Sequence, residues 1–539
     1  MTPGRDALQE PLRQEPVASG RHRPATAPPA TSRWVARFPW HSKGMVGIAG
    51  GVLVAAYVAL HLATVTISRL PWFDDTFFAS IADSVRRTGQ FNLGVGPLWI
   101  DGPVYLYGPV YFLTLAGVFD VFGVGLAQTR LPGLLCGFGI LAVGYVILRR
   151  VGVRAVAAGA ACGLLALDPT FHQSIHSGRT DSMAMLLLLA SFLLLQVSRG
   201  RSAWWSAGSG LLAALGVLTT PRPGYLAIPM GLILVWRWVR RPSRARALQA
   251  VVWAGVSLAC LAAWVAWAFG GVPAMLDYFG KFADTYAGGG LGIRAIHAPV
   301  LLPVAALLGA LVVAQPRAFR QELVFFCLAG IAGFYLFVKD KGSFSGLYAF
   351  FMIPLAYVLM GYGLSRLGDA MPTNRGARWL RYGAVGLLLS FNGGIFAARG
   401  LLEFLQRDAR DPSGAAAVIA QLVPAGSRVV GDDKYYFVVR EAGSDFQYLQ
   451  RGGSEEERAR FHAGPYDAAF LITAEPDTSP LLQAYQREMR LVPVGTISSS
   501  PDGTMARMIS DLARWAGIGS SLGGSYDGRV FARRGGGLP

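Results

Sequence analysis

Charged residues are scarce in this chain of 539 residues. Asp, Glu, Lys and Arg make up 15% of it, while hydrophobic residues make up 53%. Soluble proteins carry about 25% charged residues. This composition, with a mean hydropathy of +0.40, excludes a cytosolic enzyme built of several ordinary domains. It is typical of a membrane protein with many transmembrane helices.

Cysteines and nucleotide-binding motifs are also scarce. The four cysteines all fall inside apolar runs, which argues against disulfides and against a cysteine metal site. There is no P-loop and no Gly-rich dinucleotide fingerprint, because the glycine run at 288–290 lacks the strand and helix context of such a motif. The cysteines are Cys136, Cys162, Cys260 and Cys327.

The net charge of +17 does not indicate a nucleic-acid partner. Lys and Arg are scattered in short clusters between apolar runs, as at 149–154, 237–246 and 317–320. Cytoplasmic loops of membrane proteins collect such clusters.

Eleven apolar runs approach the length of about 20 residues that a helix needs to cross a bilayer. They predict an all-α polytopic membrane protein with about eleven transmembrane helices. The runs are 45–67, 131–148, 155–167, 182–198, 203–220, 224–236, 247–276, 298–314, 323–338, 346–365 and 382–398.

A twelfth apolar stretch, 102–119, decides the orientation of every later loop. If it does not cross, the basic clusters fall on the side of the N-terminus, as cytoplasmic loops require. We therefore expect this stretch to lie in the outer interface or to re-enter. The N-terminus is then cytoplasmic and the C-terminus extracytoplasmic, in the cell membrane.

The two ends of the chain differ from its apolar middle. Residues 1–44 are rich in Pro, Arg, Ser and Thr and read as a disordered cytoplasmic tail. Residues 45–399 form the expected catalytic domain, with 68–101 as its first external loop. Charges and turn residues become regular in 400–539, where 415–423 predicts a helix and 428–430 and 468–473 predict strands of a small extracytoplasmic α/β domain with a loose tail.

The first external loop holds two adjacent carboxylates, Asp74 and Asp75. Adjacent residues do not share a helical face, so one can act as a general base while the other anchors the loop or binds a cation. The competing interpretation is structural: Asp74 caps the following helix and Asp75 adds to the negative charge at its N-terminus.

The order of four short motifs resembles the GT-C glycosyltransferases, and most closely the superfamily of protein O-mannosyltransferases and lipid A aminoarabinose transferases. The motifs cover positions in 45–400 and lie on one side of the membrane. They are Asp74-Asp75, Tyr107-Gly108-Pro109, Arg130-Leu131-Pro132-Gly133 and Arg179-Thr180-Asp181. Two differ from the family pattern: Asp75 replaces the usual Glu, and Tyr107 stands where a basic residue is sometimes found.

The resemblance implies an inverting transfer of a monosaccharide from a polyprenyl-phosphate carrier to an acceptor outside the membrane. It makes Asp74 the catalytic carboxylate. The partners that it implies are the lipid-linked sugar donor, an acceptor that is a lipid, a glycan or a protein, and membrane lipid. A basic external pocket must then hold the phosphate. The candidates for substrate binding are Arg179, Arg222, Lys339, Lys341, Tyr107 and Asp181, the last by orienting Arg179 or helping to bind a metal. Alternatively, the basic residues only extend to water at the interface.

A divalent metal is possible but is assigned to no residue. His172 and His176 are four apart, a spacing that can hold a metal on one helix face, but the sequence places no third ligand beside them. His297 is equally ambiguous.

Two rival functions remain open. A multi-pass transporter or lipid-carrier flippase shares the apolar composition, but it is expected to have a repeated half and charges near the midplane. A scaffold subunit keeps the membrane fold without catalysis, against which the intact Asp74 argues.

Overall fold

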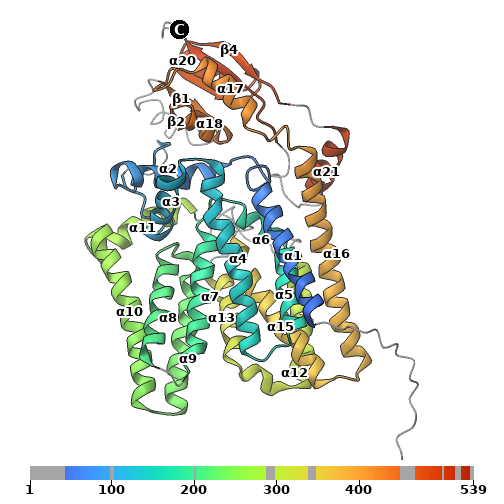
Figure 1. Cartoon of the computed structure of the whole chain (residues 1–539). Coiled ribbons are helices and arrows are strands. Elements are labelled where there is room, and N and C mark those ends of the chain that lie inside the picture. Colours follow the sequence, from blue (N-terminus) through green and yellow to red (C-terminus); the bar gives the residue numbers. More distant parts are fainter. Residues whose placement is uncertain are drawn as a thin grey trace, which may run out of the picture. The chain divides into compact units, whose positions relative to one another are not determined.

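The computed structural model describes residues 43–96, 102–199, 202–286, 298–337, 348–449, 468–499, 503–515 and 524–534. The predicted tail, 1–44, lies almost wholly outside the described residues. The chain divides into two compact units, Met1–Tyr57 and Val58–Pro539. The first contains most of α1, and the second contains every other helix and the sheet (Figure 1).

Each of the eleven predicted apolar runs is occupied largely by a helix. The predicted stretch at 102–119 forms another, α3, and the first external loop forms α2. The helices are α1 (Lys43–Thr64), α2 (Phe73–Thr88), α3 (Pro109–Phe122), α4 (Leu126–Arg150), α5 (Ala155–Ala166), α6 (Pro169–Ile175), α7 (Asp181–Val197), α8 (Ala203–Val217), α9 (Ala227–Arg240), α10 (Arg244–Phe269), α11 (Val272–Tyr286), α12 (Ala298–Ala314), α13 (Glu322–Phe337), α15 (Ile353–Ala370) and α16 (Arg375–Leu405), with 3₁₀ turns η1 (Arg222–Leu226), η2 (Pro316–Arg320) and η3 (Ala349–Phe351).

Fewer of these helices satisfy the length and apolarity that a full crossing demands. Within the described residues, four do: α4, α10, Ala349–Ala370 and α16. A fifth span results if α5 and α6, which are bent by 66° relative to each other, count as one. The protein is therefore a multi-pass membrane protein, and the number of eleven crossings stays a prediction.

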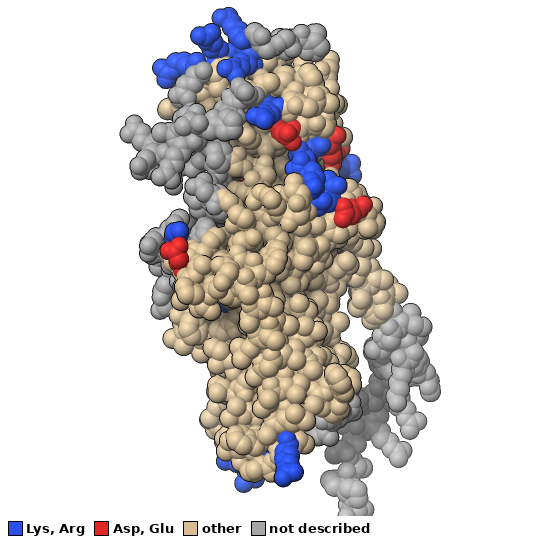
Figure 2. Space-filling model, turned by 90° about the vertical axis from the view of Figure 1, so that its left-hand side faces the viewer, with Lys and Arg blue, Asp and Glu red and all other residues tan. Residues whose placement is uncertain are grey.

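Arginines from three predicted cytoplasmic loops meet at one end of the second unit. Glu322 accepts hydrogen bonds from Arg199 and Arg237, each at 2.6 Å, and Arg317 and Arg320 line the same hollow. Figure 2 shows Lys and Arg at the lower end of the molecule and further charges toward the upper end, with a broad uncharged band between them. This separation is typical of a membrane protein whose uncharged band lies in the bilayer.

A five-stranded mixed sheet follows α16, with the strand order β2-β1-β3-β5-β4. β1 pairs in parallel with β2 and β3, while β5 is antiparallel to β3 and β4. The predicted helix at 415–423 and the predicted strands are confirmed, and α16 runs through the predicted boundary at 400. The strands are β1 (Arg428–Gly431), β2 (Asp445–Tyr448), β3 (Phe470–Thr473), β4 (Leu491–Ile497) and β5 (Gly528–Arg533), and the helices are α17 (Ser413–Leu422), α18 (Tyr436–Glu441), α20 (Pro480–Glu488) and α21 (Thr504–Trp515), with the turn η4 (Asp433–Tyr435).

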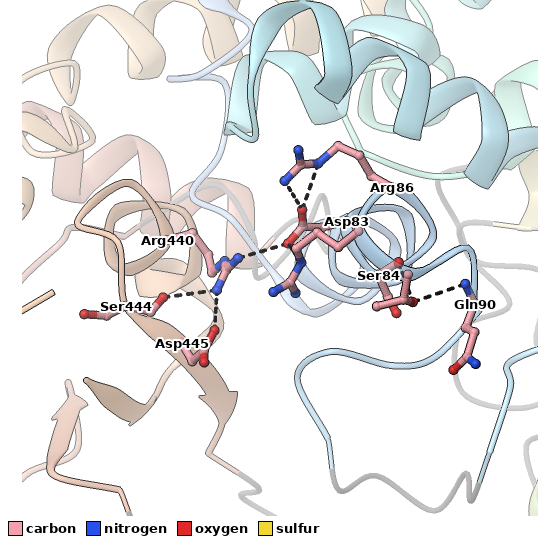
Figure 3. A network of polar contacts seen from close by, with 9 residues as sticks. Asp83, Ser84, Arg86, Gln90, Arg440, Ser444 and Asp445 are labelled. Atoms are coloured by element: carbon pink, nitrogen blue, oxygen red, sulfur yellow. Dashed lines mark hydrogen bonds and ion pairs between the residues drawn. The ribbon is translucent and has the colours of Figure 1, made fainter. Parts of the chain in front are cut away.

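An ion-pair network joins α2 to the sheet region (Figure 3). The Asp83 carboxylate, with a side chain only 1% exposed, contacts Arg86 at 2.9 Å and Arg440 of α18 at 3.0 Å. Arg87 lies 3.1 Å from the same carboxylate. Arg440 also donates to Asp445 at 2.6 Å. One buried carboxylate therefore holds guanidinium groups from two parts of the chain that lie far apart in sequence.

We expect Asp83→Asn to lower the melting temperature in detergent. The amide keeps the size but leaves three arginines facing a neutral group, and breaking a buried ion pair costs roughly 3–5 kcal/mol. Since the arginines are partly exposed, solvent screening reduces this to about 1–3 kcal/mol.

Asp445→Asn is the matched control, because it removes a second carboxylate from the same Arg440. The Asp445 side chain is 64% exposed, so its loss should change the free energy of unfolding by less than about 0.5 kcal/mol. Equal melting temperatures for the two variants would contradict the structural role of Asp83.

Candidate active site

Both carboxylates of the Asp74-Asp75 pair are buried in the first turn of α2. The N-cap of this helix is Trp72, and no side chain caps it. The interpretation in which Asp74 caps the helix is therefore wrong. The two carboxylates instead reach to different partners elsewhere in the chain.

Asp75 has both of its oxygens occupied. Oδ2 accepts from Nη2 of Arg130 at 2.7 Å, and Oδ1 accepts from the backbone N–H of Gly178 at 2.6 Å. Its side chain is 0% exposed. This arrangement ties α2 to α4 and to the segment between α6 and α7.

Arg130 extends this anchor to the loop before α2. Besides Asp75, it donates to the carbonyl oxygens of Val65, Arg69 and Leu70 at 2.9, 3.0 and 3.2 Å. Sequence analysis placed Arg130 in a motif without giving it a role. The geometry makes it the group that fixes the chain between α1 and α2.

The glycines of the motifs permit close approaches in this region. A Cβ on Gly178 would lie 2.4 Å from Cγ2 of Thr129, and a Cβ on Gly108 would lie 1.8 Å from the carbonyl oxygen of Leu218. Neither position has room for a side chain. Gly178 therefore allows its own N–H to reach Asp75, and Gly108 allows Tyr107 to enter the site.

Asp74 has a different environment from Asp75. Its Oδ2 pairs with Nη1 of Arg179, and Nε of Arg179 donates to Oδ2 of Asp181 at 2.6 Å. The Asp74 side chain keeps 12% exposure. Burial raises the pKa of Asp74 above its usual value, although Arg179 opposes the rise. Asp74 is therefore the member of the pair that keeps some exposure to solvent.

Three arginines and three aromatic rings alternate across the site, and we call this row the arginine ladder. Each guanidinium carbon lies over a ring face, at distances that suit cation–π contact. From one end to the other, Arg69 lies 4.0 Å from Trp72, Arg179 lies 6.0 Å from Trp72 and 5.4 Å from Tyr348, and Arg222 lies 4.4 Å from Tyr348 and 4.9 Å from Tyr107.

Several donors of this ladder lack an acceptor within the described residues. They are Nε and Nη1 of Arg69, Nε1 of Trp72 and Nη1 of Arg222, all buried. An unsatisfied buried donor is costly, so such groups require a partner. These four groups can only donate, and three of them belong to charged arginines, so they are suited to an anion such as a phosphate.

Most of the predicted site residues lie in this one constellation. Asp74, Asp75, Arg179 and Asp181 form its ion pairs, while Tyr107 and Arg222 form one end of the ladder. Lys339 and Lys341 lie outside the described residues. Sequence analysis missed Arg69, Trp72 and Tyr348; the only signal for the first two is their place in the loop directly before Asp74.

Comparisons with known proteins identify the fold that carries these residues. Residues 102–267 match the family model described as dolichyl-phosphate-mannose-protein mannosyltransferase. The crystal structure of ArnT from Cupriavidus metallidurans bound to undecaprenyl phosphate is similar over 92% of this chain and 99% of that chain, with a TM-score of 0.59 and 16% identity. The chain has the GT-C glycosyltransferase fold. The resemblance predicted from the sequence is thus confirmed, and with it the enzyme class, a glycosyltransferase.

Two further structures share the GT-C fold. ArnT in the apo state, from the same organism, gives a TM-score of 0.55 at 16% identity, over 90% of this chain and 98% of that chain. The arabinofuranosyltransferase AftD from Mycobacteria gives 0.51 at 15% identity, over 89% of this chain and 40% of that chain. A comparison with curated proteins gave no match.

We expect Gly178→Ala to reduce transferase activity at least about tenfold, because a displacement near 1 Å in an active site can cost a hundredfold. The added methyl group would collide with Thr129 and separate the Gly178 N–H from Asp75. Activity is measured per amount of folded protein after size-exclusion chromatography in detergent.

Gly163→Ala is the control, because a Cβ there meets no atom within 4 Å. It lies in α5 and should leave activity unchanged. Normal activity of Gly178→Ala would show that the close approach of this segment to Asp75 is not required.

Proposed function

We propose that this protein transfers a monosaccharide from a polyprenyl-phosphate carrier to an acceptor on the outer face of the cell membrane. The observation that carries the proposal is the pairing of one partly exposed carboxylate, Asp74, with buried donors for which the described part of the chain offers no acceptor. The shared GT-C fold supports it, since the similar ArnT structure holds undecaprenyl phosphate.

In this mechanism Asp74 is the general base. A carboxyl group with a raised pKa accepts a proton more readily than an ordinary one, so it can deprotonate the acceptor as the acceptor attacks the sugar. Asp75 cannot take this role while both its oxygens are bound by protein groups. Asp75 is instead a positioning residue that holds the first turn of α2.

The arginine ladder accounts for the leaving group. Arg222 and Arg69 offer guanidinium N–H groups, and Trp72 offers its indole N–H, to the phosphate of the carrier. Direct displacement of this phosphate by the acceptor inverts the anomeric centre, because no covalent sugar–enzyme intermediate forms. Arg179, the middle arginine of the ladder, pairs with the base Asp74, where it limits the charge repulsion between carboxylate and phosphate.

We expect Asp74→Asn to lower kcat by roughly 10²–10⁴, the usual contribution of a general base. The assay follows labelled sugar from a synthetic polyprenyl-phosphate donor into the envelope fraction of a deletion strain, which supplies the acceptor. Asp277→Asn is the control, because that carboxylate is 69% exposed and forms a surface pair with Lys281.

The pH profile gives a second readout for Asp74. As the pH falls through its raised pKa, the carboxylate becomes protonated and kcat/KM should fall, starting at a higher pH than for an ordinary Asp. The residual activity of Asp74→Asn should lack this acid limb. Full activity of the variant would refute the base assignment, and substrate flux across sealed vesicles without covalent transfer would favour a transporter.

The orientation of the chain is part of the same proposal, with the N-terminus cytoplasmic and α2 and the sheet outside. We expect cysteines at the exposed positions Gln90 and Glu441 to react with a membrane-impermeant thiol reagent on intact cells. A cysteine at Arg241, at the basic end, should react only after the cells are opened.

The background for this experiment lacks the four native cysteines, and labelling of opened cells controls for access at each position. Protection of Gln90 or Glu441 until opening would contradict the outer location of the site.

A further inference from the structure

Three buried histidines meet beside the catalytic constellation. His61 lies in the last turn of α1, His172 lies in α6, and His176 is the residue directly after α6. Their ring centroids are 4.5–5.1 Å apart, and one ligand atom from each ring lies within 4.8 Å of the other two. His61 supplies the third ligand that the sequence could not place beside His172 and His176.

The nitrogen atoms of the three rings differ in what they face. Nδ1 of His61 contacts Nε2 of His176. Each neutral imidazole has one lone pair, and this contact uses the lone pair of one of the two rings, so an ion bound to both would replace their hydrogen bond. Within the described residues, Nδ1 of His176 has no hydrogen-bond partner. Nη1 of Arg399 lies 3.0 Å from Nδ1 of His172, and an arginine can only donate. That lone pair therefore already faces a positive charge.

A cavity adjoins the cluster and provides space and a negative charge. Its volume is about 160 Å³, enough for an ion and water, and its lining includes His61, His172 and Glu403. Glu403, in the last turn of α16, is only 5% exposed. A carboxylate at this place offsets part of the charge of a dication and of Arg399.

We propose that His61, His172 and His176 bind one transition-metal ion of the Zn²⁺ class. Neutral imidazoles suit Zn, Cu, Fe and Ni, whereas Mg and Ca prefer oxygen ligands. Two histidines four residues apart and a third from another helix match the ligand number of many zinc sites, with the fourth position left for water or a carboxylate. This site is separate from the phosphate pocket and does not depend on the proposed glycosyl transfer.

The ion would act on the active site through the backbone that follows His176. Gly178 and Arg179, which bind Asp75 and Asp74, are two and three residues further along. A metal that ties His176 to α1 and α6 fixes the start of this segment. The role of the three histidines is therefore positioning: they hold the partners of both carboxylates and touch no substrate.

The direct test is the metal content of the full-length protein purified with a tag that contains no histidine. After incubation with Zn²⁺ and desalting, inductively coupled plasma mass spectrometry should find about one zinc per chain. His61→Ala and His176→Ala should each lower the affinity for Zn²⁺ by at least about tenfold. Gln173→Ala, on the same helix between the two histidines, should bind like the wild type.

Two further measurements separate a metal site from a metal-free histidine cluster. Co²⁺ bound to the wild type should give a visible absorption spectrum that Zn²⁺ abolishes. This measurement uses only the wild-type protein, so it does not depend on whether a variant folds. Arg399→Gln should bind Zn²⁺ more tightly, because it removes a competing positive charge from His172. Wild-type protein that takes up no Zn²⁺ and gives no Co²⁺ spectrum would overturn the proposal, as would equal zinc content in the histidine variants.

Discussion

The ion pair between Asp75 and Arg130 is the contact on which the rest of the site depends. Both side chains are fully buried, and moving two charges out of water costs several kcal/mol per ion. The pair therefore contributes more to the uniqueness of the arrangement than to stability. Arg130 offsets its desolvation with three backbone carbonyls, and in doing so it fixes the loop that carries Trp72 and starts α2.

This anchor explains why two adjacent identical residues can have different chemistry. Successive residues of a helix point about 100° apart, so fixing Asp75 toward α4 directs Asp74 toward Arg179. Asp74 then keeps a small exposed fraction and a raised pKa, while Asp75 keeps none of its oxygens free. The difference comes from position on the helix and not from residue type.

The sequence predicted those features that depend on local patterns. Apolar runs gave the helices, and the alternation of turns and short apolar segments gave α17, β1 and β3. The four motifs gave five of the predicted site residues, and the expectation of an external basic pocket gave the sixth, Arg222. Contacts across long separations could not be found in this way: Asp83 meets Arg440, and His61 meets His176 more than a hundred residues later. No local periodicity encodes such pairs. The number of crossings is also undetermined by pattern, because several apolar helices are shorter than a bilayer requires.

The bend between α5 and α6 sets the direction of α6 and of the segment that leads to the candidate active site. Pro169 has no N–H to continue the helix from α5, and Asp168 caps α6 by accepting from the N–H groups of Thr170 and Phe171 at 2.9 and 3.0 Å. The resulting angle of 66° gives α6 a direction different from that of α5. A straight continuation of α5 would carry His172 and His176 in another direction, away from His61. The break therefore places His172 and His176 beside His61. Gly178 and Arg179, which follow His176 by two and three residues in the chain, contact Asp75 and Asp74 in the first turn of α2.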